Sequence, residues 1–306
     1  MGRLCIQLLV VLIVVASIGQ SQIKVTHIDK LALPVTHSWS HPQFSPTGDA
    51  VYFTNLDGNG IWEYSLKSRT TRQITADAKS GLAYSISSDG RSLVYRRTEQ
   101  SKSRPGRKQA VILTNLTKRS TSILASGSDV SIPTFSSTTP VYSLRSQTIG
   151  LHNTAGKNEV TVLGIENTKI ALNINGNKVL LDPLGNGSYI WPVLSPDKHQ
   201  LAAYEMAKGT FVCDLTGKVR SMLGRRDAPS WTRTGTWIVY MDDKDDGHRL
   251  ISSDLFAVSP DGKTTLQLTA TSAIMELDPQ CSPKENKIIC STSEGTIIML
   301  EYEERQ

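Results

Sequence analysis

An acidic run between residues 242 and 248 has a composition that could bind a metal ion. Four carboxylates and one histidine fall within seven residues, a density of donors that could hold calcium. However, Lys244 stands where a D-x-D-x-D-G calcium loop beginning at Asp242 needs an oxygen, and no suitably placed bidentate glutamate follows. We therefore expect an exposed hairpin loop, with calcium as the alternative and no other cofactor. The metal candidates are Asp242, Asp243, Asp245, Asp246 and His248.

No arrangement of residues compels a catalytic interpretation. The sequence has no G-x-S-x-G nucleophile motif, so a serine hydrolase is not expected. Paired carboxylates for glycoside cleavage could be assembled only if the fold brought distant residues together. We therefore predict no catalytic residue and favour a protein that is not an enzyme. The carboxylates that could converge in the enzymatic alternative are Glu205, Asp227, Asp242, Asp245 and Glu276.

Several short polar or aromatic runs lie between segments that look like β-strands, where a rigid scaffold presents binding residues. The run from Arg96 to Lys108 is basic and could meet an acidic partner, but it has no interleaved aromatic residues and is more typical of a solvated loop. The candidate binding residues are Trp39, His41, Asp57, Asn59, Arg96, Arg97, Trp191, Arg225, Arg226, Asp227 and Glu276.

A repeated hairpin positions these runs. The segment Pro42–Phe53 contains a Ser-Pro-Thr-Gly turn followed by an apolar return strand, and degraded copies of it recur along the chain. Repeats of this length, with several short strands each, are typical of β-propellers. The copies begin near residues 42, 84, 133, 192, 229 and 279. We therefore predict an all-β, six-bladed propeller of four-stranded antiparallel blades. The segment Ile23–Leu33 should close the ring as the outer strand of the last blade.

The first 21 residues differ from the rest. Arg3 precedes an apolar run that ends in small residues, the pattern of a signal peptide, with a membrane anchor as the alternative. We expect one propeller domain over residues 22–306, exported to the periplasm or secreted. The net charge of +5 is spread along the chain, which argues against nucleic acid as a partner. Cys213, Cys281 and Cys290 are expected to be buried, and their odd number leaves at least one thiol free. A disulfide between Cys281 and Cys290 is disfavoured, because Cys281 should face Ile288 across a hairpin.

The repeats carry a resemblance to a known family. Phe44-Ser45-Pro46-Thr47-Gly48, Ser87-Ser88-Asp89-Gly90 and Leu194-Ser195-Pro196-Asp197 resemble the WD-like repeats of the bacterial TolB propeller family, which is six-bladed. Only the propeller is expected here, without the α/β domain that precedes it in that family. Because a ring fold offers a rigid frame with variable loops, we expect a monomeric, non-enzymatic scaffold for a protein or peptide partner in the cell envelope. A propeller-fold glycan hydrolase or lyase is the alternative.

Overall fold

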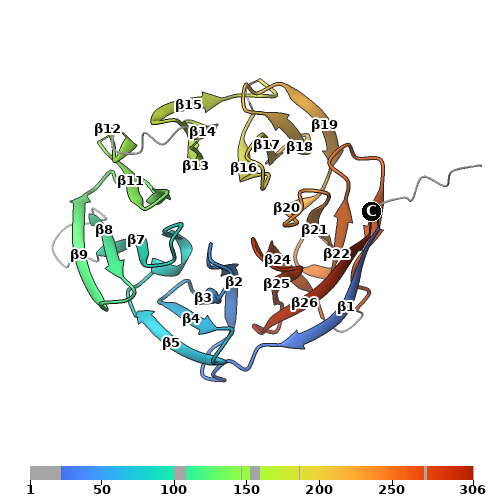
Figure 1. The fold of residues 1–306 in the computed structure, drawn as a ribbon, viewed down its shortest axis with the longest axis horizontal. Coiled ribbons are helices and arrows are strands. Elements are labelled where there is room, and N and C mark those ends of the chain that lie inside the picture. Colours follow the sequence, from blue (N-terminus) through green and yellow to red (C-terminus); the bar gives the residue numbers. More distant parts are fainter. Residues whose placement is uncertain are drawn as a thin grey trace, which may run out of the picture.

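The computed structural model describes residues 22–99, 108–145, 147–151, 159–185, 187–271 and 274–305. These residues form seven antiparallel sheets arranged as a ring around a central opening (Figure 1). Five sheets have four strands and two have three. The prediction of an all-β propeller is confirmed. The prediction of six blades, all four-stranded, is wrong, because the described chain forms seven.

We number the blades from the N-terminal side. Blade 1 contains β2 (Trp39–Phe44), β3 (Ala50–Asn55), β4 (Ile61–Ser65) and β5 (Thr70–Thr75). A short 3-10 helix, η1 (Ser80–Leu82), connects it to blade 2. Blade 2 contains β6 (Tyr84–Ile86), β7 (Ser92–Glu99), β8 (Lys108–Asn115) and β9 (Ser120–Gly127). Blade 3 contains β10 (Thr134–Ser136), β11 (Thr139–Leu144) and β12 (Gln147–Ile149), and blade 4 contains β13 (Val160–Glu166), β14 (Lys169–Ile174) and β15 (Asn177–Leu181).

The C-terminal half is more regular. Blade 5 contains β16 (Tyr189–Leu194), β17 (Gln200–Glu205), β18 (Gly209–Asp214) and β19 (Val219–Gly224), and blade 6 contains β20 (Asp227–Trp231), β21 (Ile238–Asp245), β22 (Leu250–Val258) and β23 (Thr265–Gln267). Blade 7 contains β24 (Glu276–Cys281), β25 (Lys287–Thr292), β26 (Ile297–Arg305) and the N-terminal strand β1 (Gln22–Lys30).

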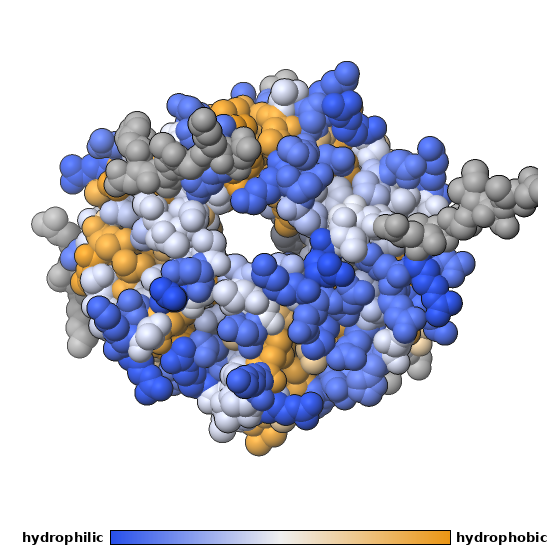
Figure 2. Space-filling model, viewed as in Figure 1, coloured by the Kyte–Doolittle hydropathy of each residue, from blue (hydrophilic) through white to orange (hydrophobic). Residues whose placement is uncertain are grey.

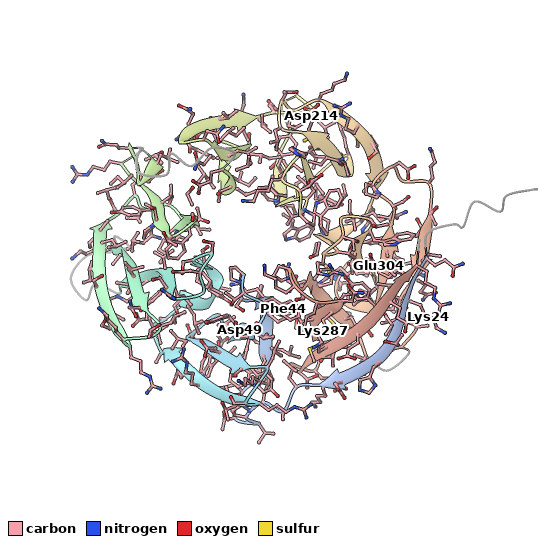
Figure 3. All side chains as sticks on the ribbon, viewed as in Figure 1. Lys24, Phe44, Asp49, Asp214, Lys287 and Glu304 are labelled. Atoms are coloured by element: carbon pink, nitrogen blue, oxygen red, sulfur yellow. The ribbon has the colours of Figure 1, made fainter. Side chains whose placement is uncertain are left out.

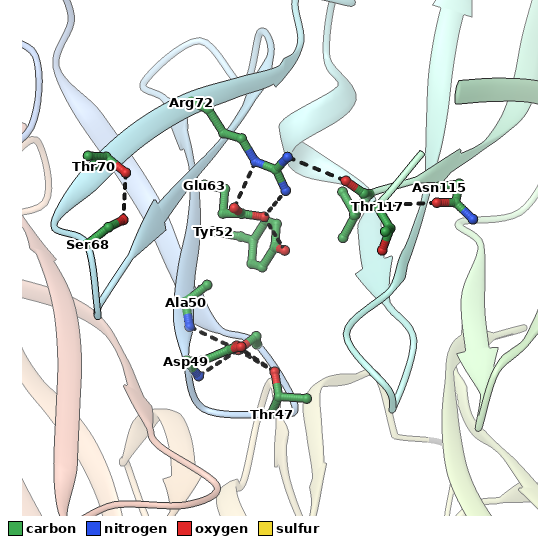
Figure 4. Close-up of polar contacts among 12 residues, drawn as sticks. Thr47, Asp49, Ala50, Tyr52, Glu63, Ser68, Thr70, Arg72, Asn115 and Thr117 are labelled. Atoms are coloured by element: carbon green, nitrogen blue, oxygen red, sulfur yellow. Dashed lines mark hydrogen bonds and ion pairs between the residues drawn. The ribbon is translucent and has the colours of Figure 1, made fainter. Parts of the chain in front are cut away.

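The repeated serine explains why the hairpins fold. Ser45 is buried, its hydroxyl donates to the Asp49 carboxylate at 2.8 Å, and it accepts the Ala50 N–H at 3.1 Å (Figure 4). Ser87 and Ser195 close their turns in the same way. The hydroxyl therefore satisfies polar groups of a turn that is packed inside the ring. This is a structural role for the most visible part of the repeat.

Blade 4 is the blade that the repeat pattern misses. The Glu159 carboxylate, just before β13, accepts the hydroxyl proton of Ser136, the last residue of β10, at 2.5 Å. The amide of Asn173, near the end of β14, donates to the same hydroxyl at 2.7 Å. The innermost strand β13 therefore starts at the same face of the propeller at which β10 ends. Blade 4 runs in the opposite sense to blade 3 and has no Ser-Pro turn, so the 59-residue interval from Ser136 to Ser195 contains a hidden blade.

The N-terminal strand closes the ring as expected. β1 pairs antiparallel with β26, from Gln22 opposite Arg305 to Lys30 opposite Ile298. Ile23 is 5% exposed and packs with Ile298, Leu300 and other core residues of blades 6 and 7. Closure therefore buries apolar surface as well as covering a sheet edge.

Apolar clusters fill the junctions between neighbouring blades, with one exception. Six clusters join blades 1 to 2, 2 to 3, 4 to 5, 5 to 6, 6 to 7 and 7 to 1. Within the described ranges, no such cluster joins blade 3 to blade 4. That junction, which we call the polar seam, holds a cavity of about 280 Å³. It is crossed by polar contacts, including Lys178 Nζ to Thr148 Oγ1 at 3.0 Å.

Polar side chains also connect blades from outside the core. Glu63 accepts two hydrogen bonds of 2.8 Å from Arg72 and one of 2.6 Å from the Tyr52 hydroxyl (Figure 4). Arg72 reaches the carbonyl of Leu116 in blade 2 at 3.4 Å. Burial, together with the hydrogen bond to Glu63, raises the pKa of Tyr52 far above its usual value. These contacts fix the first two blades relative to each other.

Two further sequence expectations concern cysteines and membranes. Cys213, Cys281 and Cys290 are free thiols, and Cys281 faces Ile288 as predicted. Burial raises the pKa of Cys213 and Cys281 to about 12, so neither is a reactive thiolate. No helix in the part of the chain that the structure describes has the length and apolarity needed to cross a membrane. The predicted signal peptide lies outside the described residues.

Candidate binding site at the channel mouth

Four innermost strands share an unusual backbone step. His41, Trp191, Ala228 and Asp278 have φ angles of 50° to 53°, and a proline follows each of them. Proline cannot donate a ladder hydrogen bond, and the pairing register shifts at this point in all four strands. Blades 5, 6, 7 and 1 therefore present one left-handed residue each, in consecutive order around the ring.

These four residues line one cavity, which we call the channel mouth. Its volume is about 330 Å³, and its wall comes from inner strands and from the chain near η1. Figure 2 shows the central opening, bordered on this face mainly by hydrophilic and neutral residues, and Figure 3 shows side chains projecting toward it. Further wall residues include Gln43, Leu82, Tyr84, Ile132, Val193 and Gln280.

Trp191 is the aromatic residue displayed there. Trp191 is 38% exposed. Its ring packs edge to face against the ring of Tyr204, with the ring centroids 5.6 Å apart. A left-handed backbone is costly for a bulky residue, roughly 1–3 kcal/mol. The surrounding blade holds Trp191 in this conformation while leaving its indole accessible, which is typical of a functional site.

A charged network lies beside Tyr204. The Arg225 guanidinium contacts the carboxylates of Asp227 at 3.3 Å, Asp243 at 3.2 Å and Asp245 at 3.8 Å. Asp227 is buried, whereas the Arg225 side chain is 56% exposed. Arg225, in the loop after β19, therefore joins one carboxylate of β20 and two of β21, and keeps its outer surface open to a ligand.

Two ionisable groups of this network have raised pKa values. Burial, and then the hydrogen bond shared with Asp243, raise the pKa of Asp227 to about 6, although Arg225 opposes the change. Burial and the charge of Asp227 also raise the pKa of Tyr204. The protonated Asp227 carboxyl is therefore favoured by burial and by its hydrogen bond with Asp243. Nearby, the Arg226 guanidinium lies 4.7 Å from the ring centre of Tyr240, a cation–π contact that anchors Arg226.

Other candidates from the sequence have structural roles. Trp39 is only 3% exposed, and its indole packs against Trp62 and Phe53, so it cannot meet a ligand at the surface. Arg96 is half-buried and donates to the carbonyl of Val130 at 3.1 Å. Arg97 lies 3.7 Å from the Asp77 carboxylate.

Two candidates in the loop after β3 are held by one lysine. The Lys79 ammonium donates to the carbonyl of Asp57 at 2.7 Å, and its backbone N–H donates to the side chain of Asn59 at 3.0 Å. His41 remains in the channel mouth, with Nδ1 3.0 Å from the Ser40 hydroxyl. Residues 100–107 of the basic run lie outside the described residues.

The acidic run does not gather its donors around one point. The Asp245 and Asp246 carboxylates accept backbone N–H groups of Gly247, His248 and Arg249, and Asp243 faces Arg225. Asp242 pairs across the strand with Asp254. In the described ranges, no group of three or more acidic, histidine or cysteine side chains is arranged to hold a metal ion. The carboxylates serve as turn formers and as partners of Arg225.

The carboxylates proposed for an enzymatic alternative are dispersed. Glu205 accepts the backbone N–H of Ala207 at 3.0 Å. Glu276 is fully buried and accepts the Thr271 hydroxyl proton at 2.8 Å, and burial raises its pKa. Asp227 and Asp245 do meet, but around Arg225.

Sequence reasoning missed Tyr204, Ala228 and Asp278, and it assigned Asp243 to a possible metal site, whereas Asp243 pairs with Arg225. For Ala228 and Asp278 a signal was present, because each precedes the proline that marks the repeat, as His41 and Trp191 do. Tyr204 gave no signal, since it looks like an ordinary strand residue.

Comparison with solved structures defines the class of fold. The chain superposes on TolB from Acinetobacter baumannii with a TM-score of 0.55 and 18% identity, covering 82% of this chain and 59% of that one. The β-propeller domain of Cps50 (Swd1) from Myceliophteria thermophila gives 0.59 and 11%, covering 92% and 99%. An oligogalacturonate lyase in complex with manganese gives 0.50 and 12%, covering 86% and 76%.

These similarities, all at low identity, establish a shared β-propeller fold and nothing finer. The chain spans 59% of the length of the TolB chain that it matches. No protein-family model matches the sequence, and no curated protein does either. The protein is therefore a seven-bladed β-propeller similar in fold to TolB and to WD40 repeats, as in RRP9, with a TM-score of 0.58.

Proposed function

We propose that this protein is an exported, non-enzymatic β-propeller that binds a protein or peptide partner at the channel mouth. The observation that carries the proposal is Trp191, a partly exposed tryptophan held in a left-handed backbone at the wall of a cavity. Tryptophan, tyrosine and arginine are the residues that most often dominate binding energy at protein interfaces. Here Trp191, Tyr204 and Arg225 form one connected group.

The site also has a rigid support. Trp191 rests on Tyr204, whose hydroxyl interacts with Asp227, and Asp227 is tied to Arg225. A preorganised aromatic surface loses little conformational entropy when a ligand binds. The cavity is open at the ring centre, which suits a projecting segment of a polypeptide.

Export to the periplasm or to the exterior remains part of the proposal. Its support is the composition of residues 1–21, with a basic start, an apolar run and small residues near the cleavage position. The resemblance of the repeats to the TolB family supports a partner in the cell envelope.

A glycan-active enzyme is the second candidate, because Asp227 has a raised pKa and shares a hydrogen bond with a second carboxylate, Asp243. The geometry disfavours it. Carboxylates that cleave glycosides stand about 5 Å or more apart, whereas these two share a hydrogen bond. Arg225 also occupies the space facing both of them.

The proposal can be tested by selecting binding peptides from a random display library on the purified protein. Dissociation constants of the selected peptides should rise about tenfold or more for Trp191→Ala, as expected for a hot-spot residue. Ile123→Ala is the matched control, because Ile123 is 60% exposed on the outer strand β9. Equal losses for both variants, or selection of no peptide, would contradict the proposed site.

A further inference from the structure

We infer that the channel mouth accepts a cationic side chain, lysine or arginine, of the polypeptide partner. This inference rests on the proposed function and names the chemistry that the site recognises. Two observations carry it. Trp191, Ala228 and Asp278 occupy the left-handed positions of blades 5, 6 and 7, and the Asp278 carboxylate has no hydrogen bond or ion pair with a described residue.

The left-handed residues bring an aromatic side chain and a carboxylate to the wall of one cavity. Trp191 in blade 5, Ala228 in blade 6 and Asp278 in blade 7 follow one another around the ring and line the same cavity. Ala228 has the smallest side chain of the three, and it lines the cavity together with Pro229 at the position between Trp191 and Asp278 in blade order. A group bound there would have the indole of Trp191 on one side and the carboxylate of Asp278 on the other.

Asp278 differs from the other carboxylates nearby. Asp227, Asp243 and Asp245 are paired with Arg225, and Glu276 accepts the Thr271 hydroxyl proton. Asp278 has no hydrogen bond or ion pair with any residue that the structure describes, yet it belongs to the cavity wall. A carboxylate in a concave site interacts most strongly with a cation that can also donate hydrogen bonds.

The remaining charges are compatible with a cation. The other ionisable side chains along the cavity wall are His41, which is already in contact with Ser40, and Tyr84, whose pKa is raised by burial so that it stays neutral. Arg225 is neutralised by its three carboxylates, so the network beside Tyr204 has an excess of negative charge. A lysine ammonium or an arginine guanidinium is attracted both to the face of an aromatic ring and to a carboxylate.

Fluorine NMR of protein labelled with 5-fluorotryptophan tests this inference. The chain has five tryptophans, and the resonance lost in Trp191→Phe identifies Trp191. The probes are the capped tripeptides Gly-Lys-Gly and Gly-Arg-Gly, the same peptide with Nε-acetyl-lysine, and Gly-Glu-Gly. The lysine and arginine peptides should shift the Trp191 resonance saturably, whereas the acetylated and acidic peptides should not.

Asp278→Asn should weaken binding of the lysine peptide about tenfold or more, because it removes the charged acceptor. Asparagine tolerates a left-handed backbone, so this variant preserves the local fold. Asp242→Asn is the matched control: it removes one negative charge from blade 6 at a residue that does not line the cavity, and should change affinity less than about twofold.

The outcomes separate this inference from the proposed function. Equal binding of the lysine and acetyl-lysine peptides would overturn the cation inference while leaving peptide binding at Trp191 intact. Tighter binding of spermidine than of either basic peptide would also overturn it, since the ligand would then be a free polyamine. If no probe shifts Trp191 although display-selected peptides do, the inference fails and the proposed function stands.

Discussion

Replacing Asp227 with asparagine should stabilise the protein at neutral pH. Asp227 is buried, and its pKa is raised from the ordinary 3.8 to about 6. That difference corresponds to about 3 kcal/mol of preference for the protonated carboxyl in the folded state. Asparagine keeps a neutral side chain that can donate to Asp243, as the protonated acid does. It therefore removes the penalty of a buried charge.

The gain is reduced by the lost contact with Arg225. Arg225 is largely exposed and keeps Asp243 and Asp245 as partners, so the lost ion pair contributes at most about 1 kcal/mol. The net expectation is a stabilisation of about 2 kcal/mol at pH about 7.5. The pKa is higher in the folded state than in the unfolded state, so wild-type stability from this group increases as pH falls through about 6. Below pH about 4 the variant and the wild type should be nearly equal.

Urea denaturation at several pH values measures this difference. Asp214→Asn provides a control of opposite sign, because hydrogen bonding to Thr216 lowers the pKa of Asp214 to about 2. That variant should be less stable than the wild type at neutral pH, and the difference should shrink as pH falls below about 4. The reasoning is refuted if Asp227→Asn is destabilised at pH about 7.5, or if its effect does not depend on pH.

Three further predictions concern the ring and export. Phe211 lies fully buried in the cluster between blades 4 and 5, so Phe211→Ala should lower the free energy of unfolding by about 3–5 kcal/mol. The exposed control Ile123→Ala should change it by no more than about 0.5 kcal/mol. Similar losses for both variants in urea denaturation would contradict the assigned core. Amide hydrogen exchange should be faster in β11 and β13, beside the polar seam, than in β17 and β21, and equal protection would contradict a weak seam. Mass spectrometry of the expressed protein should find a mature chain beginning near residue 22, and an uncleaved, membrane-bound product would favour an anchor.

The sequence alone determined the hairpin repeat and much of the ring. Ser45 and its equivalents recur because the same buried turn needs the same hydroxyl, a local requirement that a single sequence displays. The role of the N-terminal strand was also predictable, because the last blade lacked a fourth strand of its own. These features depend on contacts close in sequence or on counting strands.

The tertiary structure decided the blade number and the site. Blade 4 runs in reverse and replaces the serine turn with other contacts, so its presence could not be read from the repeat. Trp39 and Trp191 occupy similar loop regions in the sequence, yet one is buried and the other is displayed. Arg225, Asp243 and Tyr204 meet because antiparallel pairing and blade packing bring them together. Such contacts across strands and blades depend on register and packing, which residue types alone do not specify.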